Sequence, residues 1–367
     1  MIKVLTVFGT RPEAIKMAPV VLELARHPEK IKSVVCVTAQ HREMLDQVLE
    51  IFKITPDYDL NVMQPNQTLS TITSNVLSGM EEIIKKEQPD VVLVHGDTTT
   101  TFATSLAAFY QQAKIGHVEA GLRTYDKYSP FPEEINREFV SLVADFNFAP
   151  TELSAENLKR EGKRPETIFV TGNTAIDALQ TTVHESYDNP VFEWLGDSRL
   201  ILLTAHRREN LGEPMRRIFS AVRKLAEDLP DVKVVYPVHL NPKVREVANE
   251  ILDGCEKVKL IEPLEVVDFH NFMNRAEIIL TDSGGIQEEA PSLRKPVLVL
   301  RDTTERPEGI EAGTLKLVGT DENAIYTEAL KLMTDTAAYS AMAGAKNPYG
   351  DGHAAERIVQ TMIEKLG

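Results

Sequence analysis

Short apolar runs alternate with longer segments of mixed polarity along the first half of the chain. The runs are rich in β-branched residues, as strands are, and the longer segments have the three-to-four-residue apolar period of amphipathic helices. We predict strands at Val4–Phe8, Val34–Thr38, Val91–His95, Ile115–Glu119, Phe146–Ala149 and Ile168–Thr171. We predict helices at Glu13–Arg26, Glu43–Phe52, Thr71–Lys86, Phe102–Gln111, Glu133–Val143 and Ala155–Glu161. Pro19 is expected to break the first helix, because proline has no N–H to donate.

The same alternation returns in the second half of the chain. Its strands are predicted at Leu200–Thr204, Val232–Pro237, Val258–Ile261, Ile278–Leu280, Val297–Leu300 and Thr314–Leu317. Its helices are predicted at Pro214–Glu227, Lys243–Ile251, Val267–Arg275, Ile286–Leu293 and Asn323–Thr334. Nearly continuous apolar strands between helices indicate parallel sheets covered on both faces. We therefore predict an α/β protein with two Rossmann-like domains facing a central cleft.

The chain has 367 residues, which favours two domains over one core. The segment from His184 to Pro190 has no clear period and is typical of a linker. We assign residues 1–171 plus 353–367 to an N-terminal Rossmann-like domain and residues 172–352 to a C-terminal one. This assignment returns the last helix, Ala354–Lys365, to the first domain.

Composition narrows the classes of partner. The formal net charge of −15 argues against a nucleic-acid or anionic-membrane surface, because both need a basic face. No apolar run is long enough to span a bilayer, and a strand begins at once after Met1 without the pattern of a signal peptide. Cys36 and Cys255 show neither metal-ligand spacing nor a disulfide framework. We expect a cytoplasmic protein that binds a small molecule.

The segment Leu280–Glu289 ends an apolar run in Ser283, Gly284 and Gly285 and then starts a helical pattern. Glycines let a ligand approach the backbone, and a helix start presents unpaired N–H groups, so this turn suits a phosphate. Glu289 lies one helical turn further on, where a carboxylate could accept hydrogen bonds from ribose hydroxyls. The alternative is a tight turn without a ligand, but open α/β sheets bind ligands at such strand ends.

Two cations follow the first strand. Arg11 could bind a diphosphate with two parallel hydrogen bonds, and Lys16 lies near one helical turn further along. The alternative for both is a solvated side chain on a loop or helix surface.

Three carboxylates follow later strands or begin a helix. Asp97 is expected at the mouth of the cleft, although aspartate also caps helices well. Glu119 lies between apolar residues, so it is either an acid or base with a raised pKa or the partner of Arg123. For Glu133 the helix dipole alone explains a carboxylate in a first turn. No cluster with metal-ligand spacing accompanies these residues, so we expect neither a metal nor a cofactor.

Cations also follow the strands of the second half. His206 and Arg207 form a local positive centre that suits a departing diphosphate. Arg306, after a later strand, is a second candidate cation. His239 is more typical of a loop or packing residue.

Taken together and in order, seven segments resemble one known family: Phe8–Lys16, His95–Thr98, Gly116–Arg123, Pro132–Glu134, His206–Asn210, Asp282–Glu289 and Asp302–Glu308. The family is that of the non-hydrolysing UDP-N-acetylglucosamine 2-epimerases. The resemblance covers essentially the whole chain.

This resemblance implies a GT-B-like architecture with a UDP-binding C-terminal domain and a homodimer. It implies reversible conversion of UDP-N-acetylglucosamine to UDP-N-acetylmannosamine for surface polysaccharides or cell-wall polymers. In the family, UDP leaves first to give a 2-acetamidoglucal, and it then adds back with C2 inverted.

The resemblance also implies roles for individual residues. The residues implied in catalysis are Asp97, Glu119 and Glu133 for the C2 proton and ring cation, and His206 for the departing diphosphate. The residues implied in substrate binding are Arg11, Lys16, Phe269, Ser283, Gly284, Gly285, Glu289 and Arg306. A second UDP-N-acetylglucosamine, as activator, would contact Gln40, Arg207 and His239. Glu43 and Asn66 depart from the glutamine and arginine of that effector pattern.

Three other functions compete with this interpretation. A hydrolysing 2-epimerase would let water trap the sugar, and a glycosyltransferase of the same fold would require an acceptor. A sensor would bind the nucleotide sugar without turnover. Three carboxylates at one cleft favour chemistry over sensing.

Overall fold

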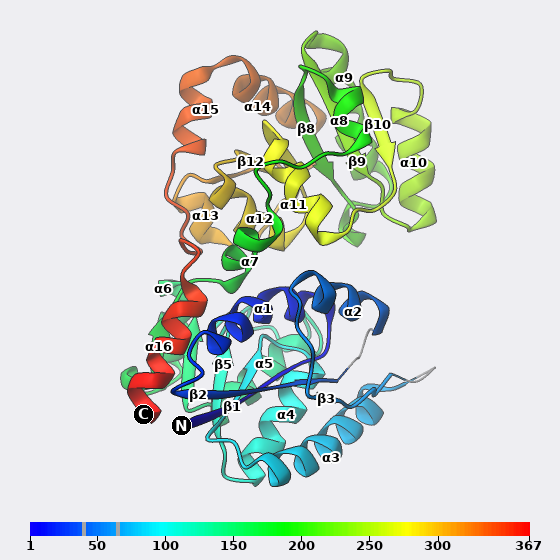
Figure 1. The fold of residues 1–367 in the computed structure, drawn as a ribbon. Coiled ribbons are helices and arrows are strands. Elements are labelled where there is room, and N and C mark those ends of the chain that lie inside the picture. The colour runs from blue at the N-terminus through cyan, green and yellow to red at the C-terminus, as the bar shows by residue number, and fades with distance from the viewer. Residues whose placement is uncertain (39–41, 64–66) are drawn as a thin grey trace. The chain divides into compact units, whose positions relative to one another are not determined.

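The computed structural model describes residues 1–38, 42–63 and 67–367, with the side chains of residues 42–44 excluded. The chain forms two compact units (Figure 1). Unit 1 is Met1–Gln180 with Tyr349–Gly367, and unit 2 is Thr181–Pro348. Unit 1 therefore includes most of helix α7 (Thr174–Thr182), which lies beyond the boundary expected at residue 171.

Over its described residues, unit 1 contains a seven-stranded sheet in the order β3-β2-β1-β4-β5-β6-β7, and the strand pairs are parallel. The strands are β1 (Ile2–Phe8), β2 (Ile31–Val37), β3 (Tyr58–Asp59), β4 (Val91–His95), β5 (Lys114–Val118), β6 (Phe146–Ala149) and β7 (Ile168–Val170). The helices besides α7 are α1 (Arg11–Ala25), α2 (Arg42–Ile51), α3 (Leu69–Glu87), α4 (Thr99–Tyr110), α5 (Glu133–Val143), α6 (Glu152–Arg160), the short η1 (Pro165–Thr167) and α16 (Ala354–Leu366).

Strand β1 shows why the apolar runs are continuous. Val4 and Phe8 belong to a core that includes side chains of α1, α2 and α16, whereas Leu5 and Val7 belong to a core with α3 and α4. Successive strand residues point to opposite faces, so a strand covered on both sides needs apolar residues at nearly every position.

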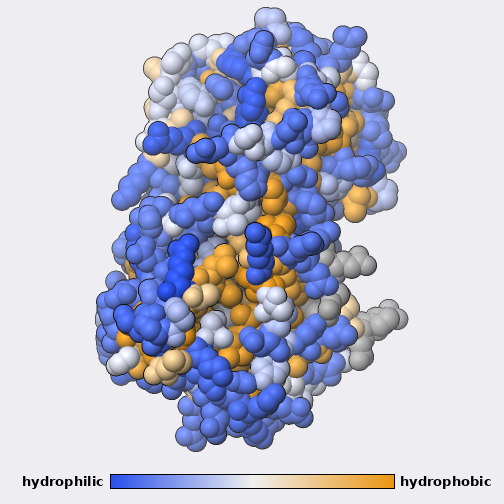
Figure 2. Space-filling model, in the orientation of Figure 1, coloured by the Kyte–Doolittle hydropathy of each residue, from blue (hydrophilic) through white to orange (hydrophobic). Residues whose placement is uncertain are grey.

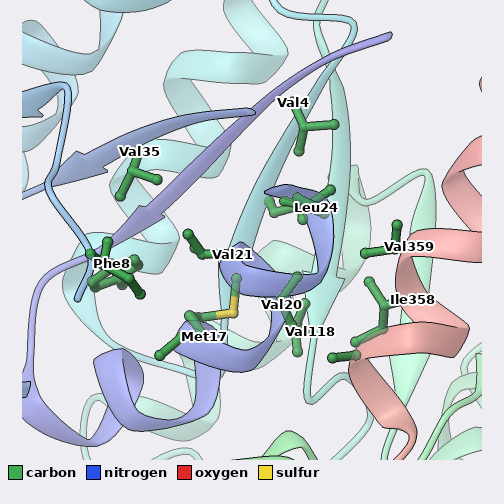
Figure 3. Close-up of a cluster of buried hydrophobic side chains, with 14 of the residues drawn as sticks. Val4, Phe8, Met17, Val20, Val21, Leu24, Val35, Val118, Ile358 and Val359 are labelled. Atoms are coloured by element: carbon green, nitrogen blue, oxygen red, sulfur yellow. The ribbon is translucent and has the colours of Figure 1, made fainter. Parts of the chain in front are cut away.

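Helix α16 completes the first of these cores from the far end of the sequence. Figure 3 shows Ile358 and Val359 of α16 beside Val20 and Leu24 of α1. Its first turn is held by the buried carboxylate of Asp177, which accepts hydrogen bonds from the backbone N–H groups of Ala354 and Ala355 at 3.2 and 2.7 Å.

The prediction for Pro19 is wrong. Helix α1 runs without a break from Arg11 to Ala25 with Pro19 inside it. Proline removes one helical hydrogen bond, but the apolar side chains on either side, Ala18 and Val20, are buried in the core. Tertiary packing therefore holds the helix together at a residue of poor helical propensity.

Unit 2, all of which is described, has a six-stranded sheet in the order β10-β9-β8-β11-β12-β13, again with parallel pairs. Its strands are β8 (Arg199–Thr204), β9 (Val232–Pro237), β10 (Val258–Ile261), β11 (Ile278–Thr281), β12 (Val297–Val299) and β13 (Leu315–Leu317). Its helices are α8 (Pro190–Leu195), η2 (Arg208–Asn210), α9 (Glu213–Asp228), α10 (Pro242–Leu252), α11 (Val266–Arg275), α12 (Gly284–Glu289), η3 (Ala290–Leu293), α13 (Pro307–Glu311), α14 (Glu322–Thr334) and α15 (Thr336–Ala343). The predicted α/β class with two Rossmann-like domains is confirmed.

The surface is of mixed polarity on the face that the space-filling view shows. On the face drawn in Figure 2, hydrophilic residues are spread over both units and are interrupted by apolar areas. Among the described residues, no helix combines the length and the apolar character needed to cross a bilayer.

Since all strands of a sheet run in one direction, the loops that follow them meet at one edge in each unit.

Candidate active site

The loops after β1, β4 and β5 of unit 1 carry three of the predicted residues. Arg11 begins α1 after β1, Asp97 follows β4 and Glu119 follows β5. These strands are neighbours in the sheet, in the order β1-β4-β5. The fold therefore brings the three loops to the same edge of one sheet.

Glu119 is held in an unusual backbone conformation. Its φ is +65°, in the left-handed region that is uncommon for residues other than glycine. Its Oε2 forms an ion pair with Lys16 and accepts a hydrogen bond from Asn173 Nδ2 at 3.1 Å. Arg123 instead pairs with Glu161, at 2.7 Å from Nε to Oε1, so a salt bridge from Glu119 to Arg123 is not what holds this carboxylate. Strained residues that the surroundings fix in place gather at functional sites.

Asp97 is tied to helix α5. Its Oδ2 pairs with Arg137, and its backbone oxygen accepts a hydrogen bond from Asn136 Nδ2 at 2.8 Å. Arg137 also pairs with Glu134, at 3.0 Å from Nη1 to Oε2. Burial alone would lower the pKa of Arg137, but Asp97 and Glu134 outweigh it and raise that pKa. Asp97 thus faces a permanent positive charge.

Two buried glutamates hold the loops on which these residues lie. Glu13 Oε2 accepts hydrogen bonds from the backbone N–H groups of Gly9 and Thr10 at 3.1 and 2.8 Å, and its Oε1 accepts one from Thr98 at 2.7 Å. It thereby joins the loop of Arg11 to the loop of Asp97. Burial raises the pKa of Glu13.

Glu134 has the same function in the loop that precedes α5. Its Oε1 accepts hydrogen bonds from the backbone N–H groups of Thr124 and Tyr125 at 2.9 and 2.8 Å. The neighbouring Glu133 is the first residue of α5 and is half-buried. For Glu133 the sequence pattern indicated only a favourable helix dipole, and the structure shows that the next residue, Glu134, holds a loop.

Two buried histidines lie at the carboxyl ends of the strands that precede Asp97 and Glu119: His95 is the last residue of β4, and His117 is the last but one of β5. His117 Nε2 lies 2.7 Å from the backbone oxygen of Gly96, and His95 Nε2 lies 3.8 Å from Glu119 Oε2. Burial lowers the pKa of each from 6.5 to about 4. Both imidazoles are therefore neutral near pH 7.

In unit 2 the predicted residues follow the neighbouring strands β8, β11 and β12. His206 follows β8, Ser283 follows β11 and Arg306 lies in the loop after β12. The ring of His206 stacks on that of His239, with centroids 5.0 Å apart and an interplanar angle of 8°. Burial lowers the pKa of His206, and Asp282 opposes this effect.

Arg306 lies directly over the start of helix α12. A Cβ added to Gly284 would come within 2.7 Å of Arg306 Nη1, whereas one added to Gly285 would meet only Glu289 Oε1, at 3.9 Å. Arg306 Nε donates to Glu288 Oε1 at 2.8 Å, and Nη1 donates to Glu305 Oε1 at 2.6 Å. Burial alone would raise the pKa of Glu305, but Arg306 and Arg301 bring it to about 2. Glycine at position 284 thus makes room for the guanidinium.

The remaining predicted residues are spread around this edge. Glu289 Oε2 lies 3.5 Å from His270 Nε2, and the half-buried Phe269 precedes that histidine on α11. Arg207 Nε donates to the backbone oxygen of Asp282 at 3.2 Å. Gln40 lies outside the described residues, as does Asn66, and the side chain of Glu43 is likewise not described.

Sequence patterns missed the residues that position the others. Arg137 contacts Asp97 and Asn173 contacts Glu119, which lie 40 and 54 positions away in the chain. Glu13 contacts Thr98, the residue after Asp97, from 85 positions away. A capping pattern, threonine followed three residues later by glutamate, is the signal that could have identified Glu13. Over residues 1–38, 45–63 and 67–367, no group of three or more His, Cys, Asp or Glu side chains could hold a metal ion.

Comparisons with known proteins agree with one another. A family model described as UDP-N-acetylglucosamine 2-epimerase matches residues 22–363. The chain is 63% identical over 366 residues to UDP-N-acetylglucosamine 2-epimerase of Bacillus subtilis, with 100% of this chain and 96% of that protein covered.

Two solved structures are also similar. The structure of a putative UDP-N-acetylglucosamine 2-epimerase from Listeria monocytogenes has a TM-score of 0.96 and 60% identity, with 100% of this chain and 98% of that chain covered. The structure of UDP-GlcNAc 2-epimerase from Neisseria meningitidis bound to UDP-GlcNAc has a TM-score of 0.88 and 52% identity, with 99% of this chain and 100% of that chain covered.

The two buried histidines predict acid sensitivity in unit 1. Since their pKa is lower in the folded protein than the ordinary histidine value of 6.5, the unfolded chain binds protons more readily, and stability falls as pH drops from 6.5 to about 4. Each histidine accounts for a loss of roughly 3 kcal/mol over that window. Replacing His117→Gln should reduce the difference in stability of β4 and β5 between about pH 7 and about pH 5, measured by urea-dependent hydrogen exchange.

The control is His353→Gln, which makes the same substitution at an exposed histidine before α16. Its difference between the two pH values should match that of the unchanged chain. An equal difference in all three proteins would contradict a role for His117.

Proposed function

The chain belongs to the UDP-N-acetylglucosamine 2-epimerase family, and from this premise we propose that it interconverts UDP-N-acetylglucosamine and UDP-N-acetylmannosamine without hydrolysing them. The observation that carries the proposal is the pair of carboxylates after neighbouring strands, Asp97 and Glu119, each held by a cation. Removing a proton from one face of a carbon and returning one to the other face requires acid and base groups in such a pair.

The proposed reaction begins with cleavage of the bond between C1 and the diphosphate oxygen. Both electrons leave with UDP, and the positive charge on the ring makes the C2 proton acidic enough for a carboxylate to remove. The product is a 2-acetamidoglucal. Protonation of C2 from the opposite face and readdition of UDP then give the epimer. Asp97, Glu119 and Glu133 are the candidates for these proton transfers.

The residues of unit 2 are proposed to act on the nucleotide end of the same substrate. The backbone of Ser283, Gly284 and Gly285 would bind phosphate oxygens together with Arg306, because backbone N–H groups at a helix start favour anions. Glu289 would accept hydrogen bonds from the ribose hydroxyls. His206 would contact the diphosphate as it leaves the sugar. From unit 1, Arg11 and Lys16 are proposed as further substrate contacts.

Two features of the family extend the proposal. Phe269 is proposed to flank the uracil. A second UDP-N-acetylglucosamine is proposed to act as an activator through Arg207 and His239, with Gln40. The stacking of His239 on His206 supports this, because a ligand on one ring would affect the other.

We also propose a cytoplasmic homodimer that serves the synthesis of polysaccharide or cell-wall polymers. Exposed apolar side chains on the neighbouring helices α4 and α5 support self-association: Phe109, Tyr110, Phe139 and Leu142. Both cysteines are free thiols, in keeping with a reducing compartment.

Solvent exchange tests the reaction. With UDP-N-acetylglucosamine in deuterated buffer, the proton NMR spectrum should show loss of the C2 proton signal in both epimers, because the abstracted proton exchanges with solvent. Free N-acetylmannosamine appearing in step with UDP would instead identify a hydrolysing enzyme. An absolute need for an acceptor would identify a glycosyltransferase. Epimerisation with full retention of the C2 proton would rule out the elimination and readdition of UDP. Binding of the nucleotide sugar without any product would identify the protein as a sensor.

Replacing Asp97→Asn tests the carboxylate. Asparagine keeps the shape of the side chain but cannot take up a proton, so turnover should fall by about 10² to 10⁴ while UDP affinity stays nearly unchanged. Steady-state kinetics and calorimetry measure the two quantities. The control is Asp90→Asn at the opposite end of β4, where the carboxylate accepts a hydrogen bond from the backbone of Lys3 at 2.7 Å. Turnover equal to that of the control would remove Asp97 from the mechanism.

A methyl group at the start of α12 tests the phosphate contacts. Gly284→Ala should displace Arg306 and weaken UDP binding about tenfold or more, since a hydrogen bond to a charged group contributes roughly 1.5–3 kcal/mol. Gly285→Ala puts the same methyl group one position further on, where it meets only the distant Glu289 Oε1, and should weaken binding much less. Calorimetric titration with UDP compares the two variants. Equal effects would argue against a role for Arg306.

A further inference from the structure

Asp282 is a buried carboxylate whose two oxygens differ sharply. Oδ2 accepts three hydrogen bonds: from the backbone N–H groups of His206 and Arg207, both at 2.8 Å, and from Asn210 Nδ2 at 3.0 Å. Oδ1 is equally buried but has no hydrogen-bond donor among the described residues. Such an unpaired buried oxygen is costly and calls for an explanation.

The group that faces Oδ1 is the imidazole of His206. Its Nδ1 lies 3.6 Å from Oδ1, which is longer than a hydrogen bond. The carboxylate is fixed by the three bonds to Oδ2, whereas the His206 side chain is 40% exposed and stacks on His239 with one face of its ring. A small rotation of the ring would bring Nδ1–H into contact with Oδ1.

The charges around His206 give that contact a consequence. His239 stacks on one face of the ring, and Arg207 is the next residue in the chain. Burial, His239 and Arg207 all lower the pKa of His206, and Asp282 is the group that raises it. Asp282 is therefore the side chain that favours a second proton on this imidazole.

We propose that Asp282 is a positioning residue for His206: Oδ2 fixes the loop after β8, and Oδ1 holds the Nδ1 proton, so that Nε2 is the nitrogen that meets the diphosphate. The proposal rests on the proposed function in assigning the diphosphate to His206. A neutral ring protonated on Nδ1 has no hydrogen to donate from Nε2. When Nε2 is also protonated, it donates a hydrogen bond to the oxygen that gains charge as the C1–O bond breaks. Asp282 then balances the imidazolium and does not touch the substrate.

Carboxylate–imidazole pairs operate by this logic in unrelated enzymes, where the carboxylate sets the tautomer and stabilises the imidazolium. A purely structural role for Asp282 would need only Oδ2. The two roles therefore differ in what happens at Nδ1 of His206, and that nitrogen can be observed directly.

The experiment compares Asp282→Asn with Asn210→Ala. In D282N the amide oxygen can still accept the backbone N–H groups, but the NH₂ group then faces Nδ1, which must become an acceptor. Nitrogen-15 NMR should show His206 protonated on Nδ1 in the unchanged protein and on Nε2 in D282N, with a lower pKa in the variant. The His206 signal is identified by its absence from H206Q. The kcat should fall about tenfold or more with little change in KM.

N210A is the matched control, because it removes a hydrogen bond from the same carboxylate without altering Oδ1. It should keep the tautomer and the pH profile of the unchanged protein. The proposal is overturned if the unchanged protein carries the proton on Nε2, a result that does not depend on any variant folding. It is also overturned if D282N keeps both the tautomer and the pKa. The expected NMR changes without turnover of UDP-N-acetylglucosamine would instead reject the proposed function and leave the pairing intact.

Discussion

Buried carboxylates that each accept two consecutive backbone N–H groups are the interaction on which the rest of the candidate site depends. Glu13, Glu134 and Asp282 each hold a loop at the edge of a sheet in this way. A loop fixed through its backbone keeps its shape whatever side chains it carries. A carboxyl oxygen that accepts two adjacent backbone N–H groups restricts both peptide units, so these contacts hold the loops close to the sheets they follow.

The cations near these loops are already paired with carboxylates in the folded protein. Lys16 pairs with Glu119, Arg137 with Asp97, and Arg306 with Glu288. The charges are thus arranged during folding, before any substrate arrives. Such preorganised charge can stabilise a transition state without further rearrangement of the protein. Cations are thus held in fixed places near these loops although the chain has a formal net charge of −15.

The sheets and the residues at their edges were predictable because both depend on local sequence. Strands covered on two faces need unbroken apolar runs, and the polar residue that ends such a run lies at the sheet edge. This reasoning located Asp97, Glu119 and His206. It missed Asn173, which contacts Glu119 from the position directly before α7, a helix that the pattern did not predict. It also missed α8 and α15, since short helices give too few turns for a clear period.

The contacts of helix α16 affect the order in which the polypeptide can fold. Strands β1 to β7 are made first, but the sheet face that Ile358 and Val359 cover lacks them until residues 354–366 have left the ribosome. Translation proceeds at about 5–20 residues per second, so part of the first core waits for on the order of ten seconds or more. Residues 181–348 contain all the strands of the second sheet and can close during that delay. The core of the part that is synthesised first is therefore completed only by the segment that is synthesised last, and part of its apolar surface stays uncovered in the interval.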